Sequence, residues 1–433
     1  MSLVVKNGRA FMGGKLVAAD VLCDKGTIKK VGKGLKGDKA IDASGKIVLP
    51  GVIDPHVHFR VPGEEYKEDW KTGSRAAAKG GVTTVLDMPN NQPSITSPLL
   101  LDRKRDAVAG KSLVNYGFHF GATAHNLDEI SDVTGVASVK VYMASSTGDL
   151  LVPDAGDLYN VFHAARVGGH LVTVHAEDNE LIHTFTAEAK QACEADPIVH
   201  TKIRRNVVAA EGASLAAIVS KEVGNRIHIC HISTRQELDI IRRAAGRITC
   251  EATTHHLFLE DTDMNRLKNY AKMNPPLRSH EDRMALWENR ALISCWCTDH
   301  AGHTKEEKDR DYWHAPSGVP GVETLLPLHL DAVNQGLETL PEMVARMSTN
   351  PARIFRLKGR GEIREGFAAD MVVVDMDAKQ TITNENVVAK CGWTPYDGLQ
   401  LQGVPTHTIV NGSVVFDGGF GDPAGVEAYD RGV

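Results

Sequence analysis

The sequence predicts an α/β protein in which a TIM-like (βα)8 barrel is joined to a small β-sandwich. In the middle of the chain, short apolar segments of strand length alternate with segments of helical length. Both ends instead contain short apolar segments separated by turns, and neither end alone has enough alternating apolar residues to close a core. We therefore expect a barrel over residues 51–354 and one sandwich built from residues 1–50 and 355–433.

Both ends of the chain are predicted to form strands and hairpins. In the first 50 residues, Asn7-Gly8, Gly13-Gly14 and Lys25-Gly26 lie at hairpin spacing, which predicts a small antiparallel sheet. Residues 369–375 and 407–416 have the same apolar texture and turn residues. Two strand-rich ends around a different middle predict that they pack together.

The barrel is predicted from eight candidate strands. They cover residues 52–59, 82–88, 115–122, 138–143, 170–175, 226–232, 248–252 and 292–297. The longest gap follows the fifth strand and contains amphipathic stretches, so we expect extra helices there. A doubly wound open sheet is the alternative, but no glycine-rich phosphate turn follows an early strand, and Gly80-Gly81 precedes its strand instead.

Composition narrows the class of protein. The 433 residues are 42% apolar and 24% charged, which is ordinary for a soluble globular protein. A net charge of −6 argues against a general nucleic-acid binder. The sequence contains no signal peptide pattern and no apolar run long enough to span a bilayer. Seven scattered cysteines fit a reducing, cytoplasmic location, and Cys295-Trp-Cys297 lacks the second pair of a structural zinc site.

The segment Val52-Ile-Asp-Pro-His-Val-His-Phe-Arg60 is the strongest local signal. Side chains alternate along a strand, so His56 and His58 project from the same face. Arg60 continues that face just before the chain turns at Pro62-Gly63. A single histidine is more often structural than ligating. Two aligned imidazoles beside a guanidinium instead predict a metal next to an anion-binding group.

Further polar residues lie at the carboxyl ends of other candidate strands, where barrel enzymes collect their chemistry. These residues are Asn90 after the second strand, Lys140 in the fourth, His175 in the fifth, His231 in the sixth and Asp299 in the eighth. His228 lies three residues from His231 and therefore faces away, so it is assigned a structural role. One such residue could be structural, but their convergence on one mouth predicts a metal centre.

Charge balance suggests a bridging ligand. Four neutral imidazoles and one aspartate could hold two divalent ions only if an anion joined them. Lys140 as an ammonium would repel the metals. A desolvated lysine can lose its proton and react with carbon dioxide to form a carbamate, which is a bridging anion.

These residues resemble the amidohydrolase superfamily over essentially the whole chain, and within it the dihydroorotases. The resemblance is carried by ordered motifs, among them Asp54-Pro-His-Val-His-Phe-Arg60 and Asp87-Met-Pro-Asn-Asn91. Further matching motifs lie at residues 67–69, 80–86, 140–143, 175–177, 231–233, 274–277, 298–303, 318–323, 350–353 and 393–396.

The resemblance implies a binuclear zinc centre. It implies that His56, His58 and Asp299 bind one zinc, that His175 and His231 bind the other, and that carbamylated Lys140 bridges them together with a hydroxide. The implied reaction is the reversible cyclisation of N-carbamoyl-L-aspartate to L-dihydroorotate in de novo pyrimidine biosynthesis, with Asp299 as the proton shuttle.

The same resemblance implies a substrate site. Arg60, Asn90 and His303 would bind the carboxylate on the ring, and Asn274 would contact the ring itself. The backbone of residues 315–318 would contribute, while His255 and His256 would only support the site. Two residues depart from the family pattern: Val61 replaces a frequent acidic residue, and Gly302 replaces a usual proline, which is expected to loosen the loop carrying His303.

Other functions are weighed against this one. An allantoinase or hydantoinase would share the metal set but needs no carboxylate clamp, so Arg60 and Asn90 favour dihydroorotate. A non-catalytic scaffold relative is expected to lose metal ligands, and none of the six is missing. The resemblance also implies a homodimer or homotetramer, association with other pyrimidine-pathway enzymes, and no nucleic-acid or membrane partner.

Overall fold

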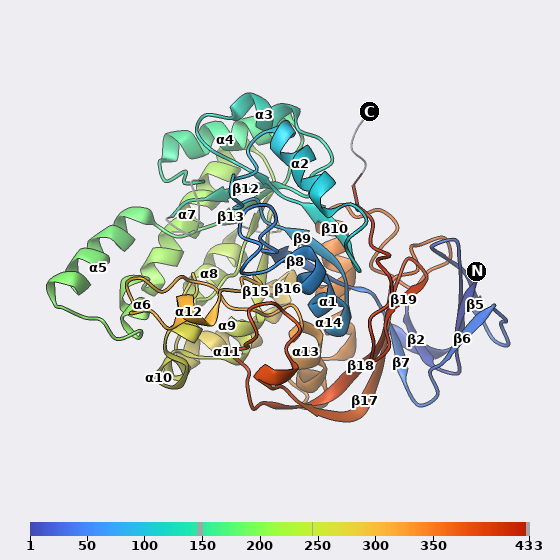
Figure 1. Ribbon diagram of the computed structural model, residues 1–433. Coiled ribbons are helices and arrows are strands. Elements are labelled where there is room, and N and C mark those ends of the chain that lie inside the picture. The colour runs from blue at the N-terminus through green and yellow to red at the C-terminus, as the bar shows by residue number, and fades with distance from the viewer. Residues whose placement is uncertain (145–149, 245, 430–433) are drawn as a thin grey trace.

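A barrel of parallel strands forms the centre of the molecule. The structure, a computed structural model, describes residues 1–144, 150–244 and 246–429. Figure 1 shows the barrel strands surrounded by the helices of the middle of the chain. The barrel strands are β8 (Val52–Val57), β9 (Val82–Asp87), β10 (Asn115–Phe118), β11 (Phe120–Gly121), β12 (Val139–Tyr142), β13 (Val172–His175), β14 (Ile227–Ile229), β15 (Ile248–Thr253) and β16 (Cys295–Cys297).

The strands close into a cylinder, as the sequence predicted. Parallel pairing runs in the orders β10-β9-β8 and β11-β12-β13-β14-β15-β16. A parallel bridge between Val57 and His300 joins the first strand to the last. β10 and β11 form the third barrel strand, interrupted at His119, whose side chain bonds to Ser138 Oγ and the Pro55 carbonyl oxygen. An open doubly wound sheet would leave the first and last strands unpaired, so that alternative is wrong.

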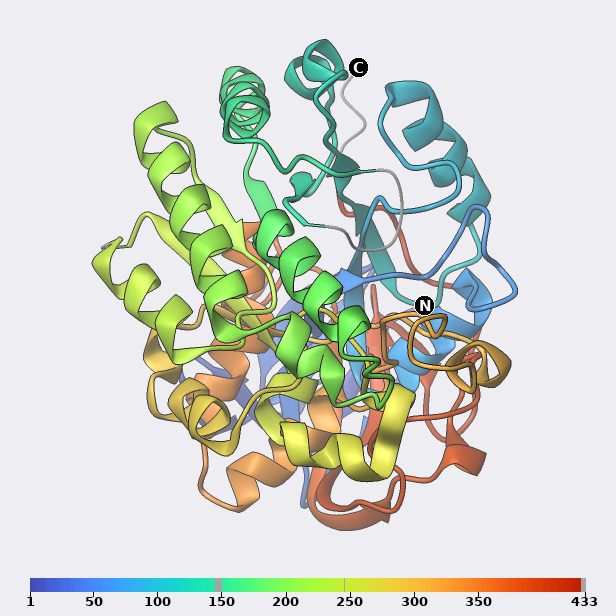
Figure 2. The same ribbon diagram turned by 90° about the vertical axis from the view of Figure 1, so that its left-hand side faces the viewer.

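Helices follow most of the strands and cover the barrel (Figure 2). The longest gap holds the predicted extra helices α5, α6 and α7. The α-helices are α1 (Trp70–Lys79), α2 (Pro98–Val108), α3 (Leu127–Asp132), α4 (Ala155–Val167), α5 (Asn179–Gln191), α6 (Val199–Ile203), α7 (Asn206–Val223), α8 (Arg235–Arg243), α9 (Thr254–Phe258), α10 (Met264–Leu267), α11 (His280–Glu288), α12 (Lys305–Lys308), α13 (Leu325–Asn334), α14 (Leu340–Val344) and α15 (Asn350–Ile354).

Local sequence sets where several helices begin and end. Asp69 caps α1 by accepting a hydrogen bond from the Thr72 amide. Thr234 and Glu237 form a reciprocal capping box at the start of α8. α7 ends at Gly224, whose φ of 80° suits a residue without a Cβ atom. Across the described ranges, none of the helices combines the length and apolar character needed to cross a membrane.

Both ends of the chain contribute to one β-sandwich, as predicted. One sheet has the order β19-β18-β17-β7-β2-β3, and the other has the order β5-β4-β1-β6. These strands are β1 (Leu3–Lys6), β2 (Arg9–Met12), β3 (Lys15–Ala18), β4 (Asp20–Asp24), β5 (Thr27–Gly32), β6 (Lys39–Asp42), β7 (Ile47–Pro50), β17 (Met371–Thr381), β18 (Gln400–Val410) and β19 (Ser413–Phe416). Val5, Val21 and Ile28 share a buried core with Met371 and Ile409. The exact limits of 1–50, 51–354 and 355–433 stay a prediction.

The purely antiparallel pairing expected for the first 50 residues is wrong. β1 pairs in parallel with β6, and β2 pairs in parallel with β7. The hairpins β2–β3 and β4–β5 are antiparallel, as the turn residues predicted. β6 and β7 run in the same direction as β1 and β2, because the intervening hairpins turn the chain back before it reaches the two later strands. Turn residues predict local hairpins but not this longer-range pairing.

Candidate active site

The first group of possible metal ligands lies where β8 meets the end of β16. Nε2 of His58 is 2.9 Å from Asp299 Oδ1, and Nε2 of His56 is 3.2 Å from the same oxygen. The three side chains offer donor atoms that all lie within 4.8 Å of one another. The alternation of side chains along the strand therefore brings both histidines to one carboxylate, as expected.

Glu251 on β15 orients His56 from behind. Its Oε1 lies 2.5 Å from His56 Nδ1, and its Oε2 lies 3.2 Å from His228 Nε2. Burial alone would raise the pKa of Glu251, but His56 and His228 hold it well below its usual range. A carboxylate that fixes the far nitrogen of a ligating histidine is a common feature of metal sites. Sequence reasoning missed Glu251, although a lone carboxylate inside an apolar strand was a usable signal.

A second pair of imidazoles faces the first group. His175 Nδ1 and His231 Nε2 are 2.9 Å apart. His175 Nε2 lies 2.8 Å from Glu177, so it can donate its proton there and leave Nδ1 with a lone pair. Burial lowers the pKa of both histidines below its ordinary value. Neutral imidazoles with inward lone pairs suit a metal ligand role.

Lys140 on β12 lies among these histidines. Its side chain is fully buried, and its ammonium contacts Cys230 Sγ at 2.9 Å. In the described ranges, no carboxylate lies within ion-pair distance of Lys140. Its positive charge is one of the influences that lower the pKa of His175 and His231. A buried cation among neutral bases, without a counter-ion, favours a modified lysine or a bound anion.

Cys230 also belongs to a further donor group. Its sulfur lies with the side chains of His56 and Glu251, and their donor atoms are all within 4.8 Å of one another. His56 therefore belongs to two overlapping groups of metal-ligand atoms. Sequence reasoning had considered only the neighbouring His231.

The backbone is strained at three residues of the candidate site. Arg60, His231 and Asp299 have φ values of 62°, 37° and 49°, in the left-handed region that favours glycine. Such conformations persist where the surrounding structure holds them, and they are frequent at functional sites. Each of the three follows the end of a barrel strand and turns its side chain at the mouth.

The predicted carboxylate-binding residues lie close together. Arg60 is 3% exposed, and its Nη2 lies 3.3 Å from His303 Nε2. Asn90 Oδ1 lies 2.6 Å from Nδ1 of His58, so the same asparagine contacts a candidate metal ligand. Burial, together with the charge of Arg60, lowers the pKa of His303 to about 3, although Glu307 opposes this. His303 is therefore a neutral group beside a permanent cation.

A small hollow lies beside the predicted carboxylate-binding residues. Asn274 lines it together with Arg60, Asn90 and Ser317. His200 Nε2 lies 2.9 Å from both Asn274 Oδ1 and the Met273 carbonyl oxygen. His200, which sequence reasoning missed, thereby holds the asparagine in place. Its distance from Asn274 in the sequence left no local signal.

Residues 315–318 are held by two buried lysines. Lys308 donates to the carbonyl oxygens of Pro316 and Gly318, both at 3.0 Å. Lys272 donates to the carbonyl oxygens of Tyr312 and Ala315, at 2.7 and 2.6 Å. In this predicted backbone contributor, the carbonyls of Ala315, Pro316 and Gly318 accept from ammonium groups, whereas the Ser317 carbonyl oxygen lies 3.0 Å from His303 Nε2.

His255 and His256 differ in their surroundings. His256 bonds to Thr253 Oγ1 and to the carbonyl oxygens of the proline pair after Asn274. His255 is buried, and neither of its ring nitrogens has a hydrogen-bond partner within the described part of the chain. Burial lowers the pKa of His255 to about 4, so its ring is neutral.

The loop around Gly302 is better fixed than its glycine suggested. Trp393 Nε1 donates to the His303 carbonyl oxygen at 2.8 Å. A Cβ atom on Gly302 would lie 3.3 Å from Cys391 Sγ, and the φ of Gly302 is not positive. Packing from the C-terminal segment therefore restrains His303 where the sequence predicted a loose loop.

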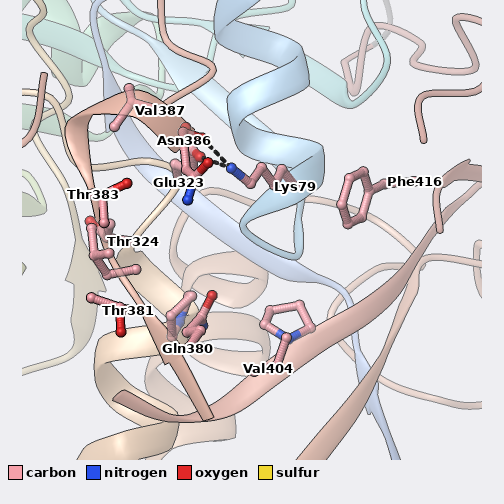
Figure 3. A pocket seen from close by; sticks show the side chains of 13 residues that line it. Lys79, Glu323, Thr324, Gln380, Thr381, Thr383, Asn386, Val387, Val404 and Phe416 are labelled. Carbon is pink, nitrogen blue, oxygen red and sulfur yellow. Dashed lines mark hydrogen bonds and ion pairs between the residues drawn. The ribbon is translucent and has the colours of Figure 1, made fainter. Parts of the chain in front are cut away.

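A larger cavity of about 490 Å³ lies elsewhere, between α1, α13 and the β17–β18 hairpin. Figure 3 shows Lys79 facing Glu323 across it, and their ion pair measures 2.7 Å. None of the candidate catalytic residues lines this cavity. The strand-end cluster is therefore the candidate active site, and the cavity of Figure 3 is not.

Comparison with known proteins places these features in a family. The model of the amidohydrolase family matches residues 47–415. A dihydroorotase of Halobacterium salinarum is 41% identical over 403 residues, covering 92% of this chain and 93% of its own length. A dihydroorotase of Pyrococcus horikoshii is 40% identical over 385 residues, covering 88% of this chain and 84% of its own.

Solved structures with the same fold are related hydrolases. The L-hydantoinase (dihydropyrimidinase) of Arthrobacter aurescens superposes with a TM-score of 0.94 at 28% identity, over 99% of both chains. The dihydropyrimidinase of Brevibacillus agri superposes with a TM-score of 0.92 at 26% identity, over 100% of both chains.

Proposed function

This chain belongs to the amidohydrolase family, and from that premise we propose that it is a dihydroorotase. It would catalyse the reversible closure of N-carbamoyl-L-aspartate to L-dihydroorotate and water, in de novo pyrimidine biosynthesis. Relatives at about 40% identity over most of the chain carry that activity in their names. The observation that carries the proposal is the buried guanidinium of Arg60, 3.3 Å from His303 at the edge of the candidate metal ligands.

The family and these relatives imply a metal cofactor. We propose two zinc ions, one held by His56, His58 and Asp299 and the other by His175 and His231. The donor set supports this fit, because burial lowers the pKa of His58, His175 and His231 below its ordinary value. Glu251 and Glu177 anchor His56 and His175 from behind. When bound, divalent ions would supply Lewis acidity toward the ring carbonyl and lower the pKa of water.

Lys140 is proposed to bridge the two metals as a carbamate. The buried amine has no carboxylate partner among the described side chains, and an anion at this position would balance the charge. Intact mass spectrometry of protein prepared with bicarbonate should show the added mass of carbon dioxide. The Lys140→Ala variant should lack this added mass. A fully metal-loaded enzyme with an unmodified Lys140 would contradict this part.

Asp299 is proposed to move the proton. Burial would raise its pKa, but His56 and His58 hold it well below its usual range, so it is a carboxylate at neutral pH. In ring opening it can accept a proton from water and donate it to the ring nitrogen as the amide C–N bond breaks. In ring closure it accepts a proton from the attacking ureido nitrogen and passes it to the hydroxyl oxygen of the substrate's protonated side-chain carboxyl group, which leaves as water.

The carboxylate on the substrate ring is proposed to lie against Arg60, Asn90 and His303. Arg60 can donate two parallel hydrogen bonds to a carboxylate, which adds orientation to charge attraction. His303 is neutral and Asn90 is uncharged, so Arg60 supplies the positive charge of this group. The group would fix the ring so that its scissile amide faces Asp299 and the metal ligands.

Substrate comparison tests the assignment. Ring opening of dihydroorotate, hydantoin and allantoin should be followed by absorbance on protein of measured metal content. We expect turnover of dihydroorotate to exceed that of the other two by at least about tenfold in kcat/KM. The hydantoinase-type structures favour a hydantoinase as the second candidate. Turnover of hydantoin or allantoin without dihydroorotate would overturn the first assignment, and no turnover by metal-loaded protein would support a non-catalytic scaffold.

The remaining proposals concern the context of the enzyme. We propose a cytoplasmic homodimer or homotetramer, in association with other pyrimidine-pathway enzymes. We also propose that residues 51–354 form the catalytic domain, with residues 1–50 and 355–433 in the sandwich domain. Light scattering after size exclusion would test the assembly, since a monomer at micromolar concentration would contradict it.

A further inference from the structure

We propose that the opposite end of the barrel carries a separate site for a small anion with two or more phosphate groups. A cavity of about 570 Å³ opens there. It is lined by residues that directly precede β12, β13 and β14, and by the segment after α15. The candidate active site lies at the carboxyl ends of these strands, so the two sites are separated by the length of the barrel.

The cavity is lined by four permanent cations and by no carboxylate among the described residues. The cations are Arg226, Arg356, Lys358 and Arg360. Of these, only Arg360 has an ion-pair partner in the described ranges, namely Asp370. Three cations thus share one concavity without compensation, in a chain whose net charge is −6. Like charges gathered in this way repel one another, and a bound anion would remove that repulsion.

The local chain geometry explains why the cations converge. Arg356, Lys358 and Arg360 lie close together in the turns that follow α15, and all three line the cavity. Arg226 approaches from the start of β14. Burial and the charge of Arg356 lower the pKa of Arg226.

Arg356 occupies a strained backbone conformation. Its φ is 56°, in the left-handed region where glycine is favoured. Its guanidinium donates to the Gly169 carbonyl oxygen at 3.3 Å, on the opposite wall of the cavity. A residue held in such a conformation, with its charge directed across a cavity, is a pointer to function rather than to stability.

The cavity of Figure 3 provides a contrast within the same molecule. There Lys79 is neutralised by Glu323 at 2.7 Å, so the cavity has no free positive charge to attract an anion. The cationic cavity also contains His170, whose Nε2 atom is buried without a hydrogen-bond partner in the described part of the chain. A polar atom of this kind can accept a hydrogen bond from a protonated oxygen of a ligand.

The chemistry of the lining selects the class of ligand. Guanidinium groups bind phosphate oxygens in pairs, and several of them suit several phosphates. The volume of about 570 Å³ exceeds what a single phosphate would fill and leaves room for a diphosphate group with an attached organic moiety. The shared chemistry is a diphosphate, either inorganic or carried by a nucleotide.

Calorimetric titration tests this site. Metal-loaded wild-type protein, with its active site saturated by carbamoyl aspartate, is titrated with ADP and separately with inorganic pyrophosphate at constant ionic strength. Metal content is measured before and after, so that chelation is not mistaken for binding. Arg226→Ala and Arg356→Gly are compared with Arg353→Ala, which removes an exposed cation on α15 that does not line the cavity.

We expect saturable binding of at least one probe, weakened at least about tenfold in Arg226→Ala and Arg356→Gly and unchanged in Arg353→Ala. Arg356→Gly should fold, since glycine suits its backbone conformation, and a melting temperature at or above wild type would support the strain argument. ADP binding without pyrophosphate binding identifies a nucleotide, and the reverse identifies inorganic diphosphate. The proposal is overturned if neither probe binds, or if all three variants bind alike. Dihydroorotate turnover should stay unchanged in all three variants. A failure of the proposed anion site can therefore be distinguished from a failure of the proposed function.

Discussion

At the level of single residues, burial and neighbouring charge decide which groups of the site are ionised. Asp299 remains a carboxylate because His56 and His58 outweigh the effect of its burial. His303 remains neutral because its burial outweighs the influence of Glu307. The proposed proton carrier is therefore charged, while the imidazole beside Arg60 is not. This contrast supports the proposal that Arg60 recognises the charge of the substrate.

Replacing Arg60 should separate substrate binding from metal binding. In Arg60→Met, we expect KM for dihydroorotate to rise at least about thirtyfold, because a buried charged hydrogen-bond pair is worth about 2–5 kcal/mol. Arg60→Lys should recover only part of this loss, since an ammonium cannot match a carboxylate with a planar fork. Steady-state kinetics and metal analysis measure both effects. An unchanged KM in Arg60→Met would exclude the carboxylate clamp.

The low pKa of His303 predicts a flat pH response. A histidine with a pKa of about 3 has no charge change near its usual value of 6.5. KM for dihydroorotate should therefore show no His303-dependent break between about pH 5 and about pH 8. The control is the dependence of KM on pH in His303→Gln. KM of this variant should be higher than that of wild type, with the same dependence on pH. A break near pH 6.5 that disappears in the variant would contradict the assignment.

The lowered pKa of His303 also predicts how the stability of the protein depends on pH. The unfolded chain binds a proton at His303 below about pH 6.5, while the folded protein does so only near pH 3. The contribution of His303 to stability is therefore complete above about pH 6.5 and declines as the pH falls toward 3. Urea unfolding of wild type and His303→Gln at two pH values within this window would measure the difference.

At the level of elements, buried lysines fix the loops that carry the proposed substrate contacts. Lys104 on α2 reaches beneath the end of β9, where it pairs with Asp87 Oδ2 at 2.5 Å and donates to Asn91 Oδ1 at 2.7 Å. Asp87 in turn accepts from the Phe59 amide at 2.6 Å. One ion pair thus connects the loop of Asn90 to the strand end that carries His58.

A double-mutant cycle tests this connection. Lys104→Met alone should destabilise the protein by about 3–5 kcal/mol, because it leaves the Asp87 charge buried and unpaired. Lys104→Met combined with Asp87→Asn should cost clearly less than the sum of the two single changes. Urea unfolding of all four proteins measures the coupling. Strict additivity would show that the two side chains do not act as a pair.

Lys308 on α12 is the corresponding anchor for residues 315–318. Its ammonium donates to three carbonyl oxygens, those of Lys272, Pro316 and Gly318. Lys308→Met removes the hydrogen-bond donor of the Pro316 and Gly318 carbonyls, at about 1–3 kcal/mol for each buried group, while the Lys272 carbonyl still accepts from the Gly318 amide. We expect KM for dihydroorotate to rise while metal content stays constant. Exposed Lys305→Met on the same helix is the control, and equal KM values for the two variants would refute an anchoring role.

At the level of the whole molecule, the candidate metal ligands connect distant parts of the barrel. His56, Lys140, His175, His231 and Asp299 come from or directly follow five different strands. The strain at His231 and Asp299 must be offset by the interactions that hold these side chains together. Bound metal would supply such interactions across the mouth of the barrel, so it should stabilise the fold as well as serve the reaction.

Metal removal should therefore lower stability and abolish activity together. After chelation, we expect loss of ring opening and a fall of several degrees in melting temperature, because a ligand that binds only the folded state stabilises it. Adding zinc back should restore both properties. Chelated Asp299→Ala is the control, since a protein that has already lost a ligand should respond less. Full activity in metal-free protein would contradict a metal-dependent reaction.

Much of the candidate site could be predicted because its signals are local. Strand alternation paired His56 with His58, and the barrel rule brought His175, His231 and Asp299 to the same end. Glu251 and His200 were missed because each acts on a residue distant in sequence. The antiparallel prediction for the first 50 residues failed for the related reason that turn residues describe neighbouring strands only.

The sequence by itself determined the fold class, the strand order of the barrel and the family of this protein. Periodicity and motif spacing contain that information, because they record which face of each element is apolar and where each strand ends. Only the tertiary structure decided which buried carboxylate orients His56, which lysines hold the loops of the proposed substrate site, and that Arg226 and Arg356 share one cavity. Those facts depend on how distant elements pack. The apolar pattern of an element specifies which of its faces is buried, but not which residues it will contact.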